Sequence, residues 1–183
     1  GIDVTGVSSR LSDWTCDRPP CAADVDAVLA AAAAEADLPL DGPFDVVASV
    51  CLLSQLLEAV KLALGETHSR YLPLVQAVRG RHLRQAVQLC RPGGRLVIVT
   101  DFVSSDTCRE LATVAEALLP ALAAQLVLAQ NFFPGLNPFL LRQLFASDPW
   151  LAARVAQPQL SKPWRWHFPA RVYAVCALTA NRR

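Results

Sequence analysis

The chain has 183 residues, of which 53% are hydrophobic and 18% charged, and its formal net charge is +1 at pH 7. This composition excludes a disordered chain, and the near-neutral charge gives no electrostatic basis for binding nucleic acid or an acidic membrane. Because the six cysteines complete neither a zinc-ligand set nor a clear disulfide framework, we expect one reduced, cytoplasmic domain over residues 1–183, with no metal.

The N-terminal quarter of the chain predicts one strand and one helix. Residues 2–11 alternate loosely between apolar and polar positions, and they could form a strand that ends near Asp13 and Trp14. An alanine-rich segment follows, and we expect it to form a peripheral helix with Asp24 as its N-cap residue.

The clearest pattern begins at DGPFDVVASV (41–50), which predicts a turn and then a short strand. Leucines and valines spaced by three and four then predict a helix, and a second helix is expected over about 70–90, with His82 on its solvated face. The segment LCRPGGRLVIVTDF (89–102) predicts a tight turn, a fully apolar strand, and an aspartate, Asp101, where the strand ends.

The next segment, 111–129, is long and apolar enough to be considered as a membrane span. Glu116 and Pro120 interrupt it, so we favour a long helix packed on a sheet, beginning at the capping-box pair Thr107 and Glu110. No membrane partner is therefore expected.

Two short helices and two strands are expected at the C-terminal end. Asn137-Pro138 and Asp148-Pro149 each have the pattern of an N-cap residue followed by proline at the first helical position. Residues 158–167 and 171–179 are strand-like and separated by a short connection, so they should be antiparallel if they pair.

The connections between the strands predict the fold. The strands near 44–50 and 95–100 are joined by a long helical segment, so they should be parallel, with a right-handed crossover. We therefore expect an α/β, Rossmann-like domain with a mostly parallel sheet, helices on both faces and a C-terminal antiparallel hairpin.

The order of these elements resembles a known family. FDVVASVCLLSQL (44–56) followed by HLRQAVQLCRPGGRLVIVTDF (82–102) is similar to the middle of the class I S-adenosylmethionine-dependent methyltransferases, and the resemblance covers roughly residues 40–180. It implies methyl transfer from S-adenosylmethionine to an acceptor, at a site beyond the carboxyl ends of the parallel strands.

The resemblance also implies candidate site residues. Those expected beside the cofactor are Asp13, Trp14, Ser49, Val50, Cys51, Ser54 and Gln55. Asp101 would position the acceptor or act as a general base, although it could instead cap the following helix. His68, after the helix that ends at a glycine, could reach the mouth of the cleft. Cys51 has no local base partner, so we expect it to line the pocket as a small apolar residue.

One departure from the family is a missing loop. The family has a G-x-G-x-G loop after its first strand, and none of the eight glycines here has that spacing. Because the chain opens at Gly1 without a methionine, we expect the glycine-loop segment to lie upstream. The alternative is a non-catalytic interaction protein that has a degenerate methyltransferase fold.

The acceptor is expected to be a small molecule, because the chain is nearly neutral and carries an aromatic loop, NFFPGLNPF (131–139). In the family this region often forms part of a substrate lid, and the alternative is a loop whose phenylalanines fill the core. WRWHF (164–168) mixes aromatic and basic residues, but on a strand Trp164 and Trp166 share one face and the basic residues share the other. No nucleic-acid partner is therefore expected.

Overall fold

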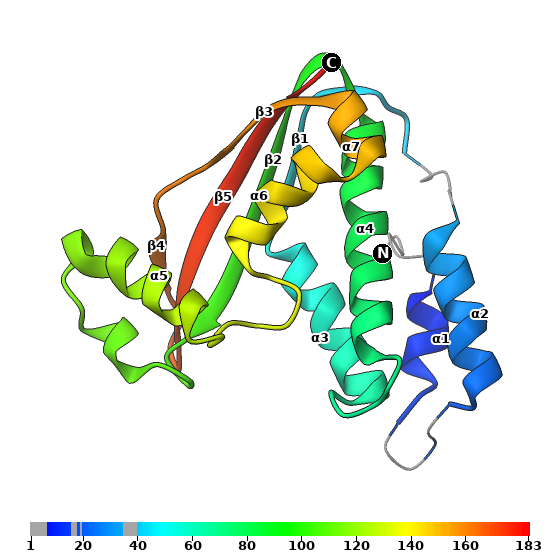
Figure 1. Ribbon diagram of the computed structural model, residues 1–183, viewed down its shortest axis with the longest axis horizontal. Helices are drawn as coiled ribbons and strands as arrows, with labels where there is room; N and C mark the ends of the chain where they lie inside the picture. The colour runs from blue at the N-terminus through cyan, green and yellow to red at the C-terminus, as the bar shows by residue number, and fades with distance from the viewer. Residues whose placement is uncertain (1–6, 16–17, 19, 35–39) are drawn as a thin grey trace.

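The computed structural model describes residues 7–15, 18, 20–34 and 40–183. Its helices are α1 (Ser8–Ser12), α2 (Ala22–Ala33), α3 (Leu52–Leu64), α4 (Tyr71–Leu89), α5 (Leu119–Leu128), α6 (Pro138–Ser147) and α7 (Pro149–Arg154), with two 3-10 turns, η1 (Arg109–Ala112) and η2 (Glu116–Leu118). Its strands are β1 (Phe44–Val50), β2 (Cys90–Ser104), β3 (Val155–Leu160), β4 (Trp164–His167) and β5 (Val172–Arg182). The expected mixture of helices and strands is confirmed (Figure 1).

The strands form one open sheet in the order β1-β2-β5-β3, with β4 also paired to β5. As expected, β1 and β2 are parallel, because α3 and α4 connect them. The prediction of a mostly parallel sheet is wrong, since β5 lies antiparallel to β2, β3 and β4. The short connection before β5 did predict an antiparallel hairpin. The structure also places β5 beside β2 and antiparallel to it, and this pairing was not expected.

The Pro-Gly-Gly segment forms an irregularity at the start of β2. Phe44 pairs with Cys90, whereas the next paired residue of β1, Val46, is opposite Arg95, so the intervening residues of β2 bulge out of the ladder. A Cβ on Gly94 would lie 2.8 Å from the carbonyl oxygen of Asp45. Glycine is therefore needed here because the backbones of β1 and β2 approach each other closely.

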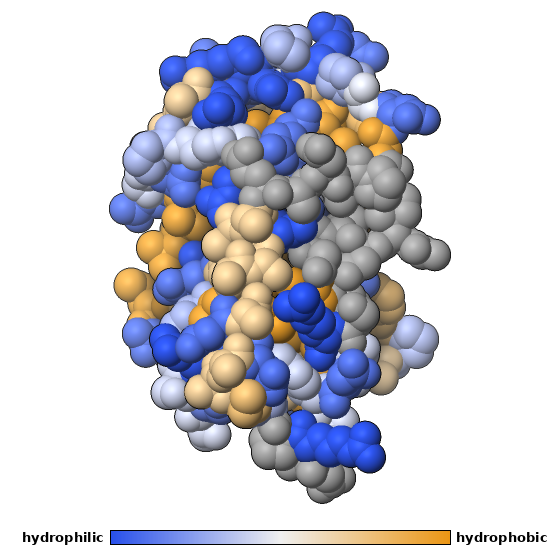
Figure 2. All heavy atoms as spheres, turned by 90° about the vertical axis from the view of Figure 1, so that its right-hand side faces the viewer, coloured by the Kyte–Doolittle hydropathy of each residue, from blue (hydrophilic) through white to orange (hydrophobic). Residues whose placement is uncertain are grey.

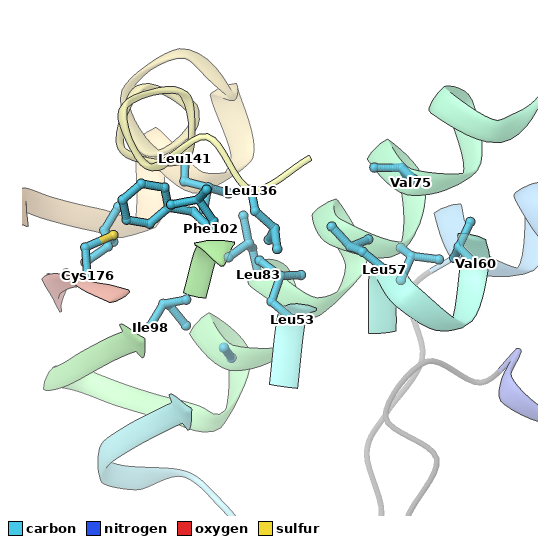
Figure 3. Close-up of a cluster of buried hydrophobic side chains, with 14 of the residues drawn as sticks. Leu53, Leu57, Val60, Val75, Leu83, Ile98, Phe102, Leu136, Leu141 and Cys176 are labelled. Atoms are coloured by element: carbon cyan, nitrogen blue, oxygen red, sulfur yellow. The ribbon is translucent and has the colours of Figure 1, made fainter. Parts of the chain in front are cut away.

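The core lies between the sheet and the helices. Helix α4 packs against β1 and β2, while α6 packs against β3 and β5 (Figure 1). Leu83 of α4 and Phe145 of α6 meet Ile98 and Cys176 of the sheet around one small void. Figure 3 shows this cluster continuing along α3 to Leu57, so one core joins the sheet to the long helices.

The opposite face of the sheet is covered less completely. Along β1 the alternate residues Phe44, Val46 and Val50 point to this side, and Val46 and Val50 are 58% and 52% exposed. On the next strand Val97 and Val99 are half-buried. Helices were expected on both faces of the sheet. At β1 the second face is not covered, and apolar side chains there are exposed to solvent.

The N-terminal region differs from the expected strand. Ser8–Ser12 form the short helix α1, and residues 1–6 lie outside the described residues. In α2 the N-cap residue is Cys21, while Asp24 occupies the third helical position and its carboxylate accepts the Cys21 N–H at 3.1 Å. Figure 2 faces the side where α2 lies and shows a pale, moderately hydrophobic band among hydrophilic residues, as expected from the exposed alanines of α2.

The prediction of a solvated His82 is wrong. The residue is only 6% exposed, because its side chain lies between α4 and the sheet, where α4 packs against β1. The neighbouring Arg81 helps to hold α2 there by donating hydrogen bonds to the carbonyl oxygens of Ala31 and Ala34. The imidazole Nε2 of His82 lies 2.8 Å from the hydroxyl oxygen of Ser49 on β1. Removal from water lowers the pKa of His82 to about 4.

The segment after β2 is more broken than expected. Instead of one long helix from Thr107, it contains η1, η2 and the ten-residue helix α5, with Pro120 in the first turn of α5. Within the part of the chain that the structure describes, every helix falls short of the length and apolarity needed to cross a bilayer. The two later helix starts are confirmed, since Asn137 and Asp148 each accept two backbone N–H groups at an N-terminus.

Candidate functional site

A cavity of about 400 Å³ lies where β1 ends at the start of α3, beside Asp101 of β2 and the β4–β5 hairpin. The strand was expected to end at Asp101, but β2 continues to Ser104. Its lining residues are Cys51, Ser54, Gln55, Asp101, Trp166, Phe168, Pro169, Ala170, Arg171 and Tyr173. Four of the residues expected at a ligand site from the sequence, Cys51, Ser54, Gln55 and Asp101, therefore lie around one cavity. This position, at the carboxyl ends of adjacent parallel strands, is where open α/β sheets bind ligands.

The polar wall of the cavity is centred on Asp101. The hydroxyl of Ser54, in the first turn of α3, lies 2.5 Å from Oδ1 of Asp101 and 2.9 Å from the carbonyl oxygen of Cys51. The single hydroxyl hydrogen can be donated to one of these two acceptors at a time. No arginine, lysine or histidine nitrogen of the described chain lies within 4.0 Å of the Asp101 carboxylate.

Cys51 connects the two strands at the base of this wall. It is the N-cap residue of α3, and its backbone has the left-handed conformation, with φ of 48°. Its N–H donates to the carbonyl oxygen of Val99 on β2, which fixes the turn between β1 and α3. Burial, and then the charge of Asp101, raise the pKa of its thiol to about 12. The thiol thus stays protonated at neutral pH, as expected for a pocket-lining residue and not for a nucleophile.

The opposite wall of the cavity is aromatic. The ring centroids of Phe168 and Tyr173 are 5.6 Å apart with planes at 88°, and those of Trp166 and Phe168 are 6.5 Å apart at 70°. In each pair the two ring planes are therefore steeply inclined, in an edge-to-face arrangement and not a parallel stack. We call the three residues Trp166, Phe168 and Tyr173 the aromatic corner. Trp166 and Tyr173 come from paired strands, and Phe168 comes from the turn between them.

Strand register explains why the aromatic wall and Asp101 share one cavity. Asp101 is opposite Val175 of β5, and Val175 is opposite Trp164 of β4. Directly opposed residues project to the same side of an antiparallel sheet. Tyr173 is two residues from Val175 and is opposite Trp166, so this pair projects to the same side as well.

A second cavity, of about 600 Å³, adjoins the first and shares Ser54, Gln55, Asp101, Arg171 and Tyr173 with it. The aromatic loop after α5 forms part of its wall through Phe133, Pro134 and Leu136. Phe132 and Phe133 also pack against the core. The phenylalanines therefore fill space in the core, as the second alternative expected, and Phe133 also borders the cavity. A role of the loop as a substrate lid stays a prediction.

The charged groups around these cavities are mostly paired. Arg171 binds Asp106 at 2.8 Å, and Lys61 binds Glu66 at 2.9 Å. Glu58 also borders the larger cavity, and no basic nitrogen of the described residues lies within 4.0 Å of it. The two cations at the cavities thus have carboxylate partners. Among the residues that the structure describes, Asp101 and Glu58 have no basic nitrogen within 4.0 Å, although the charge of Glu58 still acts on Lys61 and Arg171.

The other candidate residues lie elsewhere. Ser49 is buried against His82 on the helix-covered face of the sheet, and Val50 is exposed on the other face. Asp13 and Trp14 follow α1, and neither of them lines the two cavities. His68 lies in the turn between α3 and α4, where its Nδ1 accepts the N–H of Arg70, and it also lies outside both linings.

The aromatic wall itself was missed from the sequence. The alternation in residues 164–168 correctly suggested that Trp164 and Trp166 share one face, but that face was taken as simply buried. The signal that could have identified the site is Tyr173 on the next strand, since hairpin pairing brings it beside Trp166. Arg171, close to the turn, also escaped notice.

The structure and the comparisons assign no ligand. Among the described residues, no group of three histidine, cysteine or acidic side chains could hold a metal ion. No protein-family model matches the chain, and no curated protein or solved structure matches it either.

Proposed function

We propose that this protein transfers a methyl group from S-adenosylmethionine to a small-molecule acceptor, in a Rossmann-like domain of the class I methyltransferase type. The observation that carries this proposal is the position of Cys51, Ser54 and Asp101 beside one cavity at the carboxyl ends of the parallel strands β1 and β2. These strands are the F-D-V-V and P-G-G segments that resemble the family, and an antiparallel hairpin follows them in the chain.

The described residues fit part of a cofactor site. The two adjoining cavities, of about 400 and 600 Å³, have the size of small-molecule sites. Gln55 and the turn at Cys51 would hold the cofactor beside α3, and bound S-adenosylmethionine supplies an electrophilic methyl group. Because the sequence has no G-x-G-x-G loop, the given residues would supply more of the contacts to the acceptor than of those to the cofactor.

On the acceptor side, Asp101 can orient the acceptor and accept its proton. The hydroxyl of Ser54 reaches the Asp101 carboxylate and thereby limits its rotation. The aromatic wall offers apolar ring surface against which the acceptor would pack. Methyl transfer depends mainly on such alignment, so neither a nucleophilic triad nor a metal is needed.

A second candidate function is a non-catalytic interaction protein with a degenerate methyltransferase fold. The specific observation in its favour is the exposed apolar surface of β1, where Val46 and Val50 are more than half exposed. A strand at the edge of a sheet with exposed apolar residues is suited to pairing with another polypeptide.

Calorimetric titration of the full-length gene product with S-adenosylmethionine separates the two candidates. A methyltransferase should bind it with a dissociation constant between about 1 μM and 1 mM. Asp101→Asn should then lower the methyl-transfer rate by about 100-fold or more without changing this constant. The matched control is Asp45→Asn. It also removes one negative charge, but Asp45 lies near the start of β1, away from the cavity, where it pairs with Arg91. No heat of binding, with a native circular dichroism spectrum, would contradict the methyltransferase and favour the interaction protein.

A further inference from the structure

The cavity beside Asp101 combines two features that recognise positive charge. The faces of aromatic rings carry negative electrostatic potential, and they attract cations placed within about 6 Å of the ring centre. Trp166, Phe168 and Tyr173 all line this cavity, and their ring planes are steeply inclined to one another, so a cationic group in the cavity would meet rings of more than one orientation. Asp101 adds a full negative charge at the other wall of the same cavity.

From this arrangement we propose that the cavity binds a protonated primary or secondary amine, with its ammonium group between the aromatic corner and the Asp101 carboxylate. A neutral ligand would leave this carboxylate without a cationic partner in a partly desolvated site. An amine N–H⁺ group supplies both the charge and a hydrogen-bond donor. Glu58 borders the adjoining cavity, but Lys61 and Arg171 lie near it and offset its charge, so the cation preference of the smaller cavity depends on Asp101.

The alternative of an anionic ligand depends on Arg171, and the geometry does not favour it. Arg171 borders the cavity, but its side chain hydrogen-bonds to Tyr173 and its Nε lies 2.8 Å from Asp106, so its donors and its charge are already engaged. Half of the Arg171 side chain is exposed, which further weakens its attraction for an anion. An anion in the smaller cavity would also lie beside the Asp101 carboxylate and be repelled by it.

The amine would be the methyl acceptor, and this part of the inference rests on the proposed function. The ammonium group first gives a proton to the Asp101 carboxylate, which leaves a lone pair on nitrogen. The nitrogen forms a bond to the methyl carbon as the bond between that carbon and the sulfonium sulfur breaks. The products are the N-methylated ammonium ion and the neutral thioether, S-adenosylhomocysteine, and the proton on Asp101 passes to water.

Binding of the amine can be measured without the cofactor, so failure of this inference can be distinguished from failure of the proposed function. Three probes of similar size and different charge are suitable: benzylamine, benzyl alcohol and benzoate. Binding at pH 7 is measured from the NMR chemical shifts of ¹⁵N-labelled protein. We expect benzylamine to bind about tenfold or more tightly than benzyl alcohol or benzoate. The indole N–H of Trp166 should shift on titration. That of Trp150, which stacks with Arg154 at 4.2 Å on α7, should not.

Two variants test the site itself. Asp101→Asn keeps an acceptor for the Ser54 hydroxyl and should reduce the preference for benzylamine about tenfold, whereas Asp45→Asn should leave it unchanged. Phe168→Leu, at an exposed position in the hairpin turn, should weaken benzylamine several-fold without unfolding the protein. Equal affinity for the three probes, or a preference for benzoate, would overturn the inference. Binding of S-adenosylmethionine together with such a result would leave the methyltransferase proposal intact.

Discussion

Burial of His82 should make the stability of the protein depend on pH in a defined window. The pKa of this imidazole is 6.5 in an unfolded chain and about 4 in the folded protein, because its surroundings disfavour the charged form. As the pH falls below 6.5, the unfolded chain binds a proton at this position and the folded chain does not. Stability is therefore complete above about pH 7 and is lost progressively as the pH falls toward 4.

The size of the effect follows from the two pKa values. Each pKa unit corresponds to about 1.4 kcal/mol, so the free energy of unfolding should fall by about 3 kcal/mol across the window. This is a large part of the 5–15 kcal/mol that stabilises an ordinary domain, roughly speaking. Carboxylate titration contributes to any acid unfolding curve, so the effect of His82 must be isolated by a variant.

His82→Gln is a suitable variant, because its side chain is neutral over the whole range and can still bond to the Ser49 hydroxyl. Urea unfolding, followed by circular dichroism from pH 7.5 to 4.5, gives the free energy for both proteins. The difference between them should change by about 1 kcal/mol per pH unit below pH 6, with the wild type losing more stability. His68 and His167 are present in both proteins and cancel. Parallel curves would show that His82 is protonated equally in the folded and unfolded states, and the reasoning from burial would fail.

Three further predictions concern individual contacts. Gly94→Ala should cost more than about 2 kcal/mol in urea unfolding, because a Cβ would meet backbone oxygens at 2.8 Å, whereas Gly80→Ala within α4 should stabilise by up to about 1 kcal/mol; similar values for both would contradict the close approach. Arg182→Met should cost about 1–2 kcal/mol, since Arg182 donates to carbonyl oxygens at the end of α4; an unchanged unfolding midpoint would refute this. At pH 8, iodoacetamide should label exposed Cys21 well before Cys51, as measured by mass spectrometry, and equal rates would disprove the raised pKa of Cys51.

The parts of the fold that were predicted correctly have local causes. The N-cap roles of Asn137 and Asp148 depend on one side chain and the proline after it, and both are confirmed. The parallel pairing of β1 with β2 follows from the long helical connection between them. In contrast, the place of β5 beside β2 depends on pairing between distant strands, which no local pattern records.

The errors in the candidate site have a different cause, which is the ambiguity of a strand with apolar or small residues on both faces. In FDVVASV nearly every position could point to the core, so the sequence shows that Ser49 and Val50 face opposite sides but not which of the two sides is buried. The structure resolves this by burying Ser49 against His82 and leaving Val50 exposed. His82 was expected in solvent because arginines surround it in the sequence, and only the pairing with Ser49 shows that it faces the sheet.

The aromatic wall shows how such a site can still be found by reasoning across strands. Trp166 and Tyr173 are separated by a short turn, and pairing of the two strands must bring them opposite each other. What the sequence could not show is that β5 also lies against β2, which places this pair on the same side as Asp101. The arrangement of the proposed binding site thus depends on one antiparallel pairing that local patterns predict and a second that they do not. A change in the register of β5 by one residue would move Tyr173 to the other face and separate the aromatic rings from the carboxylate.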